Sequence, residues 1–489
     1  MQMFDSFPRK SSCPTARLSV VAIASLVTAS VLLAAAPLRA ASYIWAVASG
    51  DWSVASNWAG SLPTGGDTAY VVNGGTVNVT TLGETCGALS LGGTAGSGTL
   101  QMTGGSLSAA SYEYVGDSGT GTFAQSGGSN NVGNGTLCLG YNIGSSGAYN
   151  LSGNGQLSAF NENVGFSGAG TFTQSGGTST VTSALSLSAS GIYNLTGGAL
   201  LVPGIQGTGV FNLGGGTLVA NAALSTAQPM TLTGSGGNGN INADGYPITL
   251  SGLLSGTGGL SKWGAGTLTL TASDSYTGTT AVNNGILKLD FSAVGAPGSN
   301  IINNISNSST LALGGGNAIV IMDYGSLNIA SAIVNNASGA TLTLSGPGIT
   351  TLSGTNTYTG ATWINNGPTL RVGNGGNSGT LGSGNVTNNG TLIFSRSDAG
   401  LSGSDNTYTA GTLVAAGTLD VTNSDALPGG TGLTVGAGGT VIFDPAPAGA
   451  PMVATRSLAA VPEPAALELM AAALWSAVIY HRFRCRCKR

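Results

Sequence analysis

A short glycine-led motif recurs between Gly98 and Ala220, and this repetition constrains the fold more than any other feature of the chain. Each copy has an alternating apolar strand, a Ser/Thr-Gly-Gly-type turn and a second short strand. The copies start at nearly regular intervals, at Gly98, Gly121, Gly147, Gly170, Gly191 and Gly209. A unit this short cannot bury its apolar side chains alone, whereas stacked copies form a continuous core. Strands of adjacent coils would then pair in parallel, about 4.8 Å apart.

Alternation within the strands indicates which side chains face the core. Thr267–Leu270 and Thr341–Leu344 both read Thr-Leu-Thr-Leu, and a period of two predicts leucines inside and threonines outside. Asn-Gly pairs predict left-handed corners between strands, and they stand at Asn284-Gly285, Asn366-Gly367 and Asn389-Gly390. The sequence therefore predicts an all-β protein, a right-handed parallel β-helix (β-solenoid). A set of antiparallel sandwiches is the alternative, and the near-constant coil length disfavours it.

The second half of the body repeats a longer pattern. Gly264–Leu289 and Gly346–Val372 align at a constant offset as far as Pro368, and Asn406–Val421 is a third copy. Three tyrosines fall in register at a strand-to-corner position, and we predict a structural role for them: Tyr276, Tyr358 and Tyr408. The first copy resembles the autotransporter-associated β-strand repeat, through Lys262-Trp263-Gly264-Ala265-Gly266-Thr267-Leu268 and Tyr276-Thr277-Gly278. That family implies a β-helical passenger. We expect no autotransporter barrel in this chain, so the resemblance concerns the repeat rather than the export route.

Three tryptophans mark the start of the body. The stretch from Tyr43 to Asp67 contains Trp45, Trp52 and Trp58 and resembles the module that often opens such proteins. An uncapped β-helix exposes a strand edge and its core, so we expect the three indoles to close the first coil. An aromatic platform for sugars is the alternative.

The N-terminus has the pattern of a secretory signal. Arg9, Lys10 and Arg17 precede the apolar stretch Leu18–Ala36, and small residues follow. This order is typical of a signal peptide, with cleavage expected between Ala40 and Ala41. An uncleaved membrane anchor is the alternative.

The C-terminus has three parts in a fixed order. The tetrapeptide Val461-Pro462-Glu463-Pro464 precedes an apolar run to Tyr480, and a basic end follows. As a helix, 465–480 would be about 24 Å long against a hydrocarbon core of about 30 Å, which favours transient retention over a permanent span. The order is similar to the PEP-CTERM sorting signal, with Val461, Pro462, Glu463 and Pro464 as the sorting motif. That resemblance implies recognition by an exosortase-type membrane protease in a bacterium with an outer membrane.

The expected organisation has six parts. They are a signal peptide (1–40), a Trp-rich capping module (41–97), a solenoid of Gly-rich coils (98–257), a solenoid of autotransporter-associated repeats (258–445), a linker (446–460) and the sorting tail (461–489). We expect a helix at each end, the N-terminal signal helix and a C-terminal hydrophobic helix. The body would cross the inner membrane and reach the cell surface or the extracellular matrix.

The charge of the body excludes nucleic acid as a partner. Between Ala41 and Ala460 the chain has five basic and fifteen acidic side chains, whereas a nucleic-acid binder needs a basic patch. The expected partners are the secretion machinery and the exosortase-type protease. Exopolysaccharide and the cell envelope are candidates outside the cell.

The residue types needed for catalysis are scarce. The chain has one histidine, His481 in the basic tail, so the body can hold no Ser-His-Asp or Cys-His arrangement and no histidine-containing metal site. We therefore predict no catalytic, cofactor-binding or metal-binding residues. The rival interpretation is a glycan-cleaving enzyme, because stacking could bring together carboxylates that are distant in sequence; these are Asp244, Asp274, Asp290 and Asp323.

Two smaller features remain. Cys86 and Cys138 could pair in an oxidising compartment, but we favour two small buried residues in the core. The segment 236–241 vaguely resembles a calcium-binding nonapeptide turn, and we interpret it as a Gly-rich corner. The sequence thus predicts an exported, non-enzymatic surface or matrix protein that is structural or adhesin-like. A glycan-binding or glycan-cleaving β-helix is the alternative.

Overall fold

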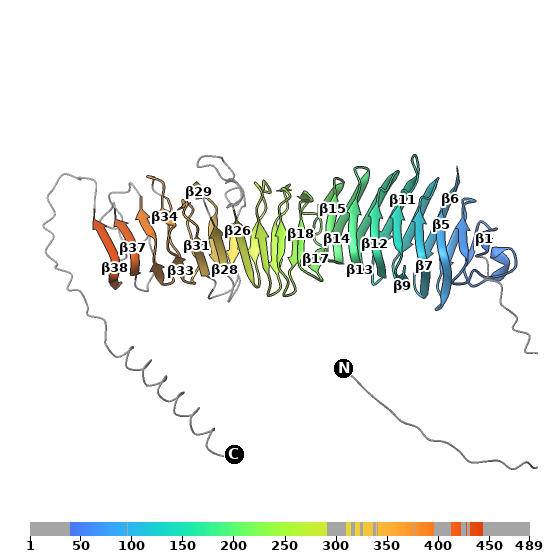
Figure 1. The fold of residues 1–489 in the computed structure, drawn as a ribbon, viewed down its shortest axis with the longest axis horizontal. Coiled ribbons are helices and arrows are strands. Elements are labelled where there is room, and N and C mark those ends of the chain that lie inside the picture. The colour runs from blue at the N-terminus through green and yellow to red at the C-terminus, as the bar shows by residue number, and fades with distance from the viewer. Residues whose placement is uncertain are drawn as a thin grey trace, which may run out of the picture. The chain divides into compact units, whose positions relative to one another are not determined.

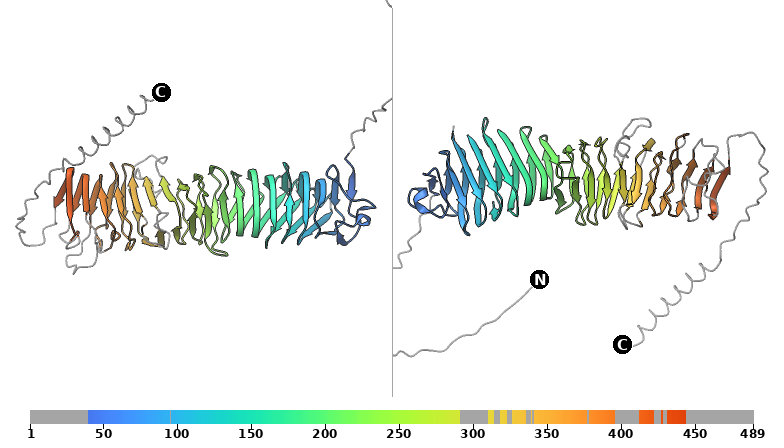
Figure 2. Two further views of the ribbon diagram at one scale, coloured as in Figure 1. Left: turned by 90° about the horizontal axis from the view of Figure 1, so that it is seen from below. Right: turned by 180° about the vertical axis from the view of Figure 1, so that it is seen from behind.

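The computed structural model describes a single stack of β-strand coils. The described residues are 40–94, 96–290, 310–313, 318–322, 326–335, 339, 341–376, 378–395, 412–421, 427 and 431–443. The predicted signal and C-terminal helices lie outside them, as does Asp323. In the views of Figures 1 and 2 the coils follow one another in chain order from β1 to β38.

Three ladders of parallel strands make up the stack. Ladder 1 has two runs. The first run is β1 (Ser42–Ile44), β3 (Thr68–Val71), β5 (Glu84–Leu91), β7 (Ser106–Val115), β10 (Thr136–Leu139), β12 (Gln156–Val164), β13 (Ala169–Leu187) and β15 (Ile205–Gly207). The second run is β18 (Leu224–Thr226), β21 (Ile248–Leu250), β24 (Thr267–Leu270), β26 (Ile286–Asp290), β28 (Ala318–Met322), β31 (Thr341–Ser345), β33 (Thr362–Ile364), β35 (Val386–Asn388), β37 (Thr412–Val421) and β38 (Leu433–Phe443).

Ladders 2 and 3 form the other sides of the coil, and the longer strands bend to serve two or three ladders. Ladder 2 is β2 (Ser49–Asp51), β4 (Thr76–Val79), β6 (Ser97–Met102), β8 (Thr120–Gln125), β11 (Ser146–Leu151), β13, β14 (Gly191–Val202), β16 (Val210–Leu213), β19 (Met230–Leu232) and β22 (Leu254–Ser255), with a later run of β29 (Ser326–Ile329), β32 (Ile349–Leu352), β34 (Thr369–Val372), β36 (Thr391–Phe394), β37 and β38. Ladder 3 is β5, β7, β9 (Ser129–Asn131), β12, β13, β14, β17 (Thr217–Ala220), β20 (Gly239–Asn242), β23 (Leu260–Trp263), β25 (Thr280–Val282), β27 (Thr310–Leu313) and β30 (Ala332–Asn335).

The pairing register gives the coil length. In ladder 1, Thr68 pairs with Ala88, Ala88 with Tyr112, Tyr112 with Thr136, and Thr136 with Asn161. The spacing of these successive partners is close to the repeat read from the sequence. The pairings between described strands are parallel, which confirms the β-solenoid and excludes the antiparallel sandwiches. The right-handed winding stays a prediction.

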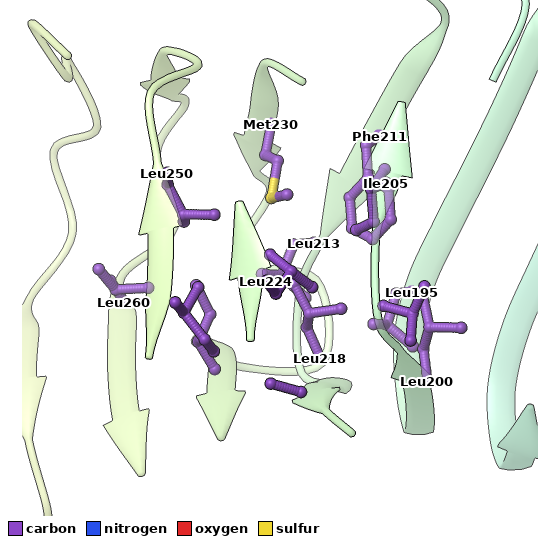
Figure 3. Close-up of a cluster of buried hydrophobic side chains, with 14 of the residues drawn as sticks. Leu195, Leu200, Ile205, Phe211, Leu213, Leu218, Leu224, Met230, Leu250 and Leu260 are labelled. Atoms are coloured by element: carbon purple, nitrogen blue, oxygen red, sulfur yellow. The ribbon is translucent and has the colours of Figure 1, made fainter. Parts of the chain in front are cut away.

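Apolar side chains fill the interior of the coils. Leu268, Leu270, Leu342 and Leu344 are at most 2% exposed, while the intervening threonines lie half-buried on the outside, as the alternation predicted. Figure 3 shows the same inward packing around Leu213, Leu218 and Phe211. Five rings stack inside ladder 2 at centroid distances of 4.5 to 5.3 Å: Phe123, Tyr149, Phe172, Tyr193 and Phe211. Each coil therefore contacts the next through equivalent side-chain positions.

Glycine has two separate functions in these coils. Gly285 and Gly367 have φ of 72° and 115°, which confirms the predicted left-handed corners. The same prediction is wrong for Asn389-Gly390, where neither residue has a positive φ. Gly390 instead donates its N–H to Asn388 Oδ1, and a Cβ there would overlap the Pro368 carbonyl of the preceding coil. At that corner glycine is required by close approach between coils rather than by its backbone conformation.

The long repeat does not keep its place on the coil. In the first copy Thr267–Leu270 (β24) lies in ladder 1, and its sequence equivalent in the second copy, Ile349–Leu352 (β32), lies in ladder 2. Strand β23 before the first copy belongs to ladder 3, whereas its equivalent β31 belongs to ladder 1. The repeat is therefore a strand–turn–strand unit that occupies different sides of the coil in its first two copies.

Candidate functional site

The structure describes the residues at the predicted signal cleavage point but not those of the predicted sorting motif. The sorting motif Val461, Pro462, Glu463 and Pro464 lies outside the described residues. Ala40 and Ala41 are exposed at the first position of the stack. The Ala41 N–H donates to Asp67 Oδ1 at 2.9 Å, and the Ala41 carbonyl accepts from Thr68 N–H at 2.8 Å. The segment after the predicted cleavage point is thus bonded to the first coil.

Asp67 is the acceptor at the centre of this contact. The residue is only 6% exposed, and its Oδ2 accepts from the Thr64 backbone at 3.0 Å and hydroxyl at 2.6 Å. The Thr64 hydroxyl and the Ala41 N–H lower the pKa of Asp67, because both stabilise its ionised form. Between Ala40 and Ser261 the sequence contains no Lys or Arg, so no side-chain cation from these coils pairs with this carboxylate.

The three tryptophans pack as a buried cluster in the first coil. Trp45, Trp52 and Trp58 are each 1% exposed. Trp58 meets the other two edge-to-face, with centroids 4.9 and 4.8 Å away, and its Nε1–H donates to the Trp52 carbonyl at 2.9 Å from the short 3-10 helix Ala55–Trp58. All three rings are buried, and their capping role stays a prediction. This burial excludes the sugar platform, which requires exposed ring faces.

Other residues singled out from the sequence serve the fold. Tyr276 and Tyr358 are buried, and each hydroxyl bonds a threonine of the same corner, Thr280 at 2.6 Å and Thr362 at 2.5 Å; Tyr408 lies outside the described residues. Cys86 and Cys138 are free thiols and buried, as favoured. In the segment 236–241, Gly236 and Gly237 have positive φ and form a turn before β20. Within the described ranges, no group of three or more His, Cys, Asp or Glu is placed to hold a metal ion.

The carboxylates considered for a glycan-cleaving enzyme lie in separate environments, as far as the structure describes them. Asp274 Oδ1 accepts the Leu254 N–H of the preceding coil at 2.8 Å, and burial raises the pKa of Asp274 to about 7. Asp290 forms an ion pair with Lys288 at 2.7 Å. Asp244 is exposed on a corner with φ of 45°. Asn356, the sequence equivalent of Asp274, accepts the Ile333 N–H in the same manner, so this position is a backbone cap.

Two buried glutamates were missed in the sequence. Glu113 and Glu162 are 0% exposed. Asn130 Nδ2–H donates to Glu113 Oε2 at 2.9 Å, and the Ser179 hydroxyl donates to Glu162 Oε1 at 2.5 Å. Burial raises the pKa of each to about 7. The signal that could have revealed them is a shared sequence offset, since the same displacement relates Glu113 to Glu162 and Asn130 to Ser179.

Lys262 is 0% exposed, and it is the one buried cation among the residues of the body that the structure describes. Its ammonium donates to the carbonyls of Trp263, Gly264 and Asn284 at 2.7, 2.7 and 3.0 Å. Burial lowers the pKa of this amine to about 8. All three N–H donors are occupied by backbone, so Lys262 closes a corner and does not face a substrate.

A row of aromatic rings lies on the outside of three successive coils. Its members are Tyr112 and Tyr114 on β7, Tyr141 after β10 and Phe166 after β12. Tyr112 stacks on Tyr114 at 5.5 Å, Tyr114 meets Tyr141 at 4.5 Å, and Tyr141 stacks on Phe166 at 5.3 Å. Tyr112 is 46% and Phe166 49% exposed. This surface is named the aromatic row.

Three segments of the chain match a known repeat family. A family described as passenger-associated-transport-repeat matches residues 260–289, 342–372 and 385–421. The predicted resemblance of these repeats is thereby confirmed. The chain is also 34% identical over 184 residues to the adhesin BmaC autotransporter of Brucella suis biovar 1 (strain 1330), which covers 33% of this chain. The chain spans 5% of the length of that adhesin. No solved structure matches.

The described residues contain no helix that is long and apolar enough to cross a membrane.

Proposed function

We propose that this chain is an exported bacterial surface protein, adhesin-like and non-catalytic, whose solenoid presents its outer faces to the surroundings. The observation that carries the proposal is that the described parts of the three passenger-type repeats lie within one parallel solenoid. The similarity to an autotransporter adhesin supports the same role. Each buried carboxyl group described above, and the Lys262 ammonium, has at least one bond to backbone or to another buried side chain, which is the behaviour of a structural core rather than of an active site.

We propose that the chain is sorted through its ends. The signal peptide would be removed between Ala40 and Ala41, and the tail would be recognised at Val461-Pro462-Glu463-Pro464 by an exosortase-type protease after transient retention in the inner membrane. Two prolines fix an extended stretch that a protease can bind. Because the Ala41 N–H already bonds Asp67, cleavage would convert it to an α-ammonium beside a buried carboxylate. That ion pair would supply the cation which the sequence of these coils lacks.

Surface exposure is tested in the native cells. We expect externally added protease to degrade the protein on intact cells while a periplasmic marker survives. Mass spectrometry of the mature protein should give an N-terminus at Ala41 and a C-terminus between Val461 and Ala465. Deletion of 482–489 should release an uncleaved chain into the periplasm or medium. Protection of the protein on intact cells contradicts the surface role, and recovery of the peptide around Trp475 from envelopes contradicts the sorting step alone.

The terminal ion pair is tested by Asp67→Asn. We expect the exported protein to melt a few degrees lower, because the substitution removes a charge-assisted bond. In a chain kept in the cytoplasm, where Ala40 stays attached, the same substitution should cost less. Asp51→Asn, on an exposed strand residue, is the matched control and should leave both melting temperatures unchanged. Equal losses in the two forms would show that Asp67 serves only the backbone amide.

A further inference from the structure

The aromatic row is a surface that the fold itself does not require. In the register of ladder 1, the positions that match Tyr112 in the next coils are Thr136, Asn161 and Ala184. These small or polar side chains complete the same ladder, so a ring at this place is not needed for stacking. The interior of the same coils already has its own stack of rings. Half-exposed aromatic rings gathered on one surface are typical of a binding site.

The geometry of the row leaves ring faces available to a ligand. Tyr112 and Phe166 are its end members, and each stacks on one side within the row. Tyr112 is 46% and Phe166 49% exposed, so nearly half of the surface of each residue meets solvent. Tyr114 and Tyr141 between them are half-buried and tilt by 51° to each other. The row advances from one coil to the next by about the spacing of parallel strands, which is roughly the length of one pyranose in an extended chain.

Charge decides what kind of ligand this surface accepts. No Lys or Arg occurs between Ala40 and Ser261, so the row has no cation from its own coils to hold a phosphate, a sulfate or a uronate. The polar groups beside the row are amides, hydroxyls and the Asp117 carboxylate. In the pairing register, Tyr114 is followed by Cys138, Asn163 and Ser186 on the next coils, and Asn142 adjoins Tyr141. Asp117 is fixed by Asn142 Nδ2–H at 3.1 Å and by the Ser90 hydroxyl at 2.8 Å. A complementary ligand is uncharged, has C–H faces for the rings and has hydroxyls for the amides.

We propose that the aromatic row binds a linear, neutral polysaccharide, with pyranose rings stacked on Tyr112 and Phe166. Hydroxyl groups of the polysaccharide would donate to neighbouring amide oxygens such as those of Asn142 and Asn163, whose N–H groups already bond within the fold. Carbohydrate C–H groups carry partial positive charge and the face of an aromatic ring is negative, so the two attract. The row extends over successive coils, which suits the interior of a long chain better than a terminal sugar. This inference rests on the proposed surface role, because only an exported protein meets such a chain.

Affinity electrophoresis of the purified, exported chain tests the proposal. The gels contain one soluble polysaccharide each: mixed-linkage β-glucan, galactomannan, dextran, or anionic alginate. We expect at least one of the three neutral polymers, and not alginate, to retard the protein. Tyr112→Ala and Phe166→Ala should each weaken binding by about tenfold, and the double variant should migrate as in a plain gel. Disaccharides of the same polymer should compete poorly.

Matched variants separate binding from folding. Trp363→Ala removes an aromatic ring of similar exposure, 45%, from a later coil, and it should keep full retardation. Circular dichroism of each variant should match that of the unchanged protein, because these side chains lie outside the core.

The proposal is overturned if no neutral polymer retards the protein, if the double variant is retarded equally, or if alginate is the polymer that binds. Release of reducing ends from a retained polymer contradicts a purely binding role. None of these outcomes bears on surface exposure, which the protease experiment measures separately.

Discussion

Leu268→Asp is expected to unfold the coils around it. Leu268 is 0% exposed and pairs with Ile248 and Leu287 of the neighbouring coils. Replacement removes a buried leucine, which costs about 2–5 kcal/mol for truncation alone, and places an unpaired carboxylate in an apolar core. Because stability in a solenoid depends on contacts between neighbouring coils, the loss should spread to adjacent coils. Circular dichroism melting and limited proteolysis of the purified chain measure it.

The control for this substitution is the next residue. Thr269 lies half-buried on the outer side of β24, and in the register its neighbours are Thr249 and Lys288. Thr269→Asp introduces the same charge at a place where water and a lysine are available, so we expect a change of less than about 1 kcal/mol. Leu270→Asp should behave like Leu268→Asp, since Leu270 is 2% exposed. Similar effects at all three positions would show that the assigned faces are wrong.

Alternation made the faces of the later coils predictable, but it misleads in β7. The sequence Tyr112-Glu113-Tyr114-Val115 suggests tyrosines inside and glutamate outside. The structure has the reverse, because Glu113 lies in register between Leu89 and Leu137 of the adjacent coils. A register shift between Cys86 and Ala88 precedes this segment. The position of a strand relative to its neighbours therefore decides the face, and that information is absent from the strand itself.

The sequence also could not show on which side of the coil each copy of the long repeat begins. A constant offset between the copies identifies equivalent strands but does not say which side of the coil each occupies. The coils between the two copies vary in length, and the second copy begins one ladder away from the first. The buried carboxyls and the aromatic row were missed for the same reason, since both are defined by neighbours from other strands of the stack. The repeat, the core alternation and the buried cysteines depend on local pattern, and these could be predicted.

Acidification from pH 8 to pH 5 is expected to stabilise the protein. Burial raises the pKa of Glu113, Glu162 and Asp274 to about 7 in the folded chain, against about 4 in the unfolded chain. The folded state then binds more protons than the unfolded state between those values, so the free energy of unfolding falls as pH rises from about 4 to about 7. Each carboxyl accounts for about 2–3 kcal/mol over this interval. The opposite shift of Asp67 acts at lower pH, because the pKa of that residue is lowered.

The hydrogen-bonding partners around Glu113 suit the protonated, uncharged form of its side chain. Asn130 Nδ2–H donates to Glu113 Oε2, while Glu113 Oε1 and Asn130 Oδ1 have no partner among the described residues. A proton on Oε1 would complete an acid–amide pair and give both atoms a hydrogen bond. Tyr149 and Cys86, the titratable neighbours of this carboxyl, have pKa values raised by burial and stay uncharged over the same range.

Glu113→Gln is therefore expected to mimic the protonated side chain. An amide at this position accepts from Asn130 and donates in return, so the variant should match the unchanged protein at pH 5 and exceed its stability at pH 8 by about 2–3 kcal/mol. Combination with Glu162→Gln should flatten most of the pH dependence of the melting temperature between these values. Asp244→Asn, at an exposed corner, is the control and should leave the slope unchanged. A melting temperature that rises with pH, or a double variant with the original slope, would mean that these carboxyls are ionised in the fold.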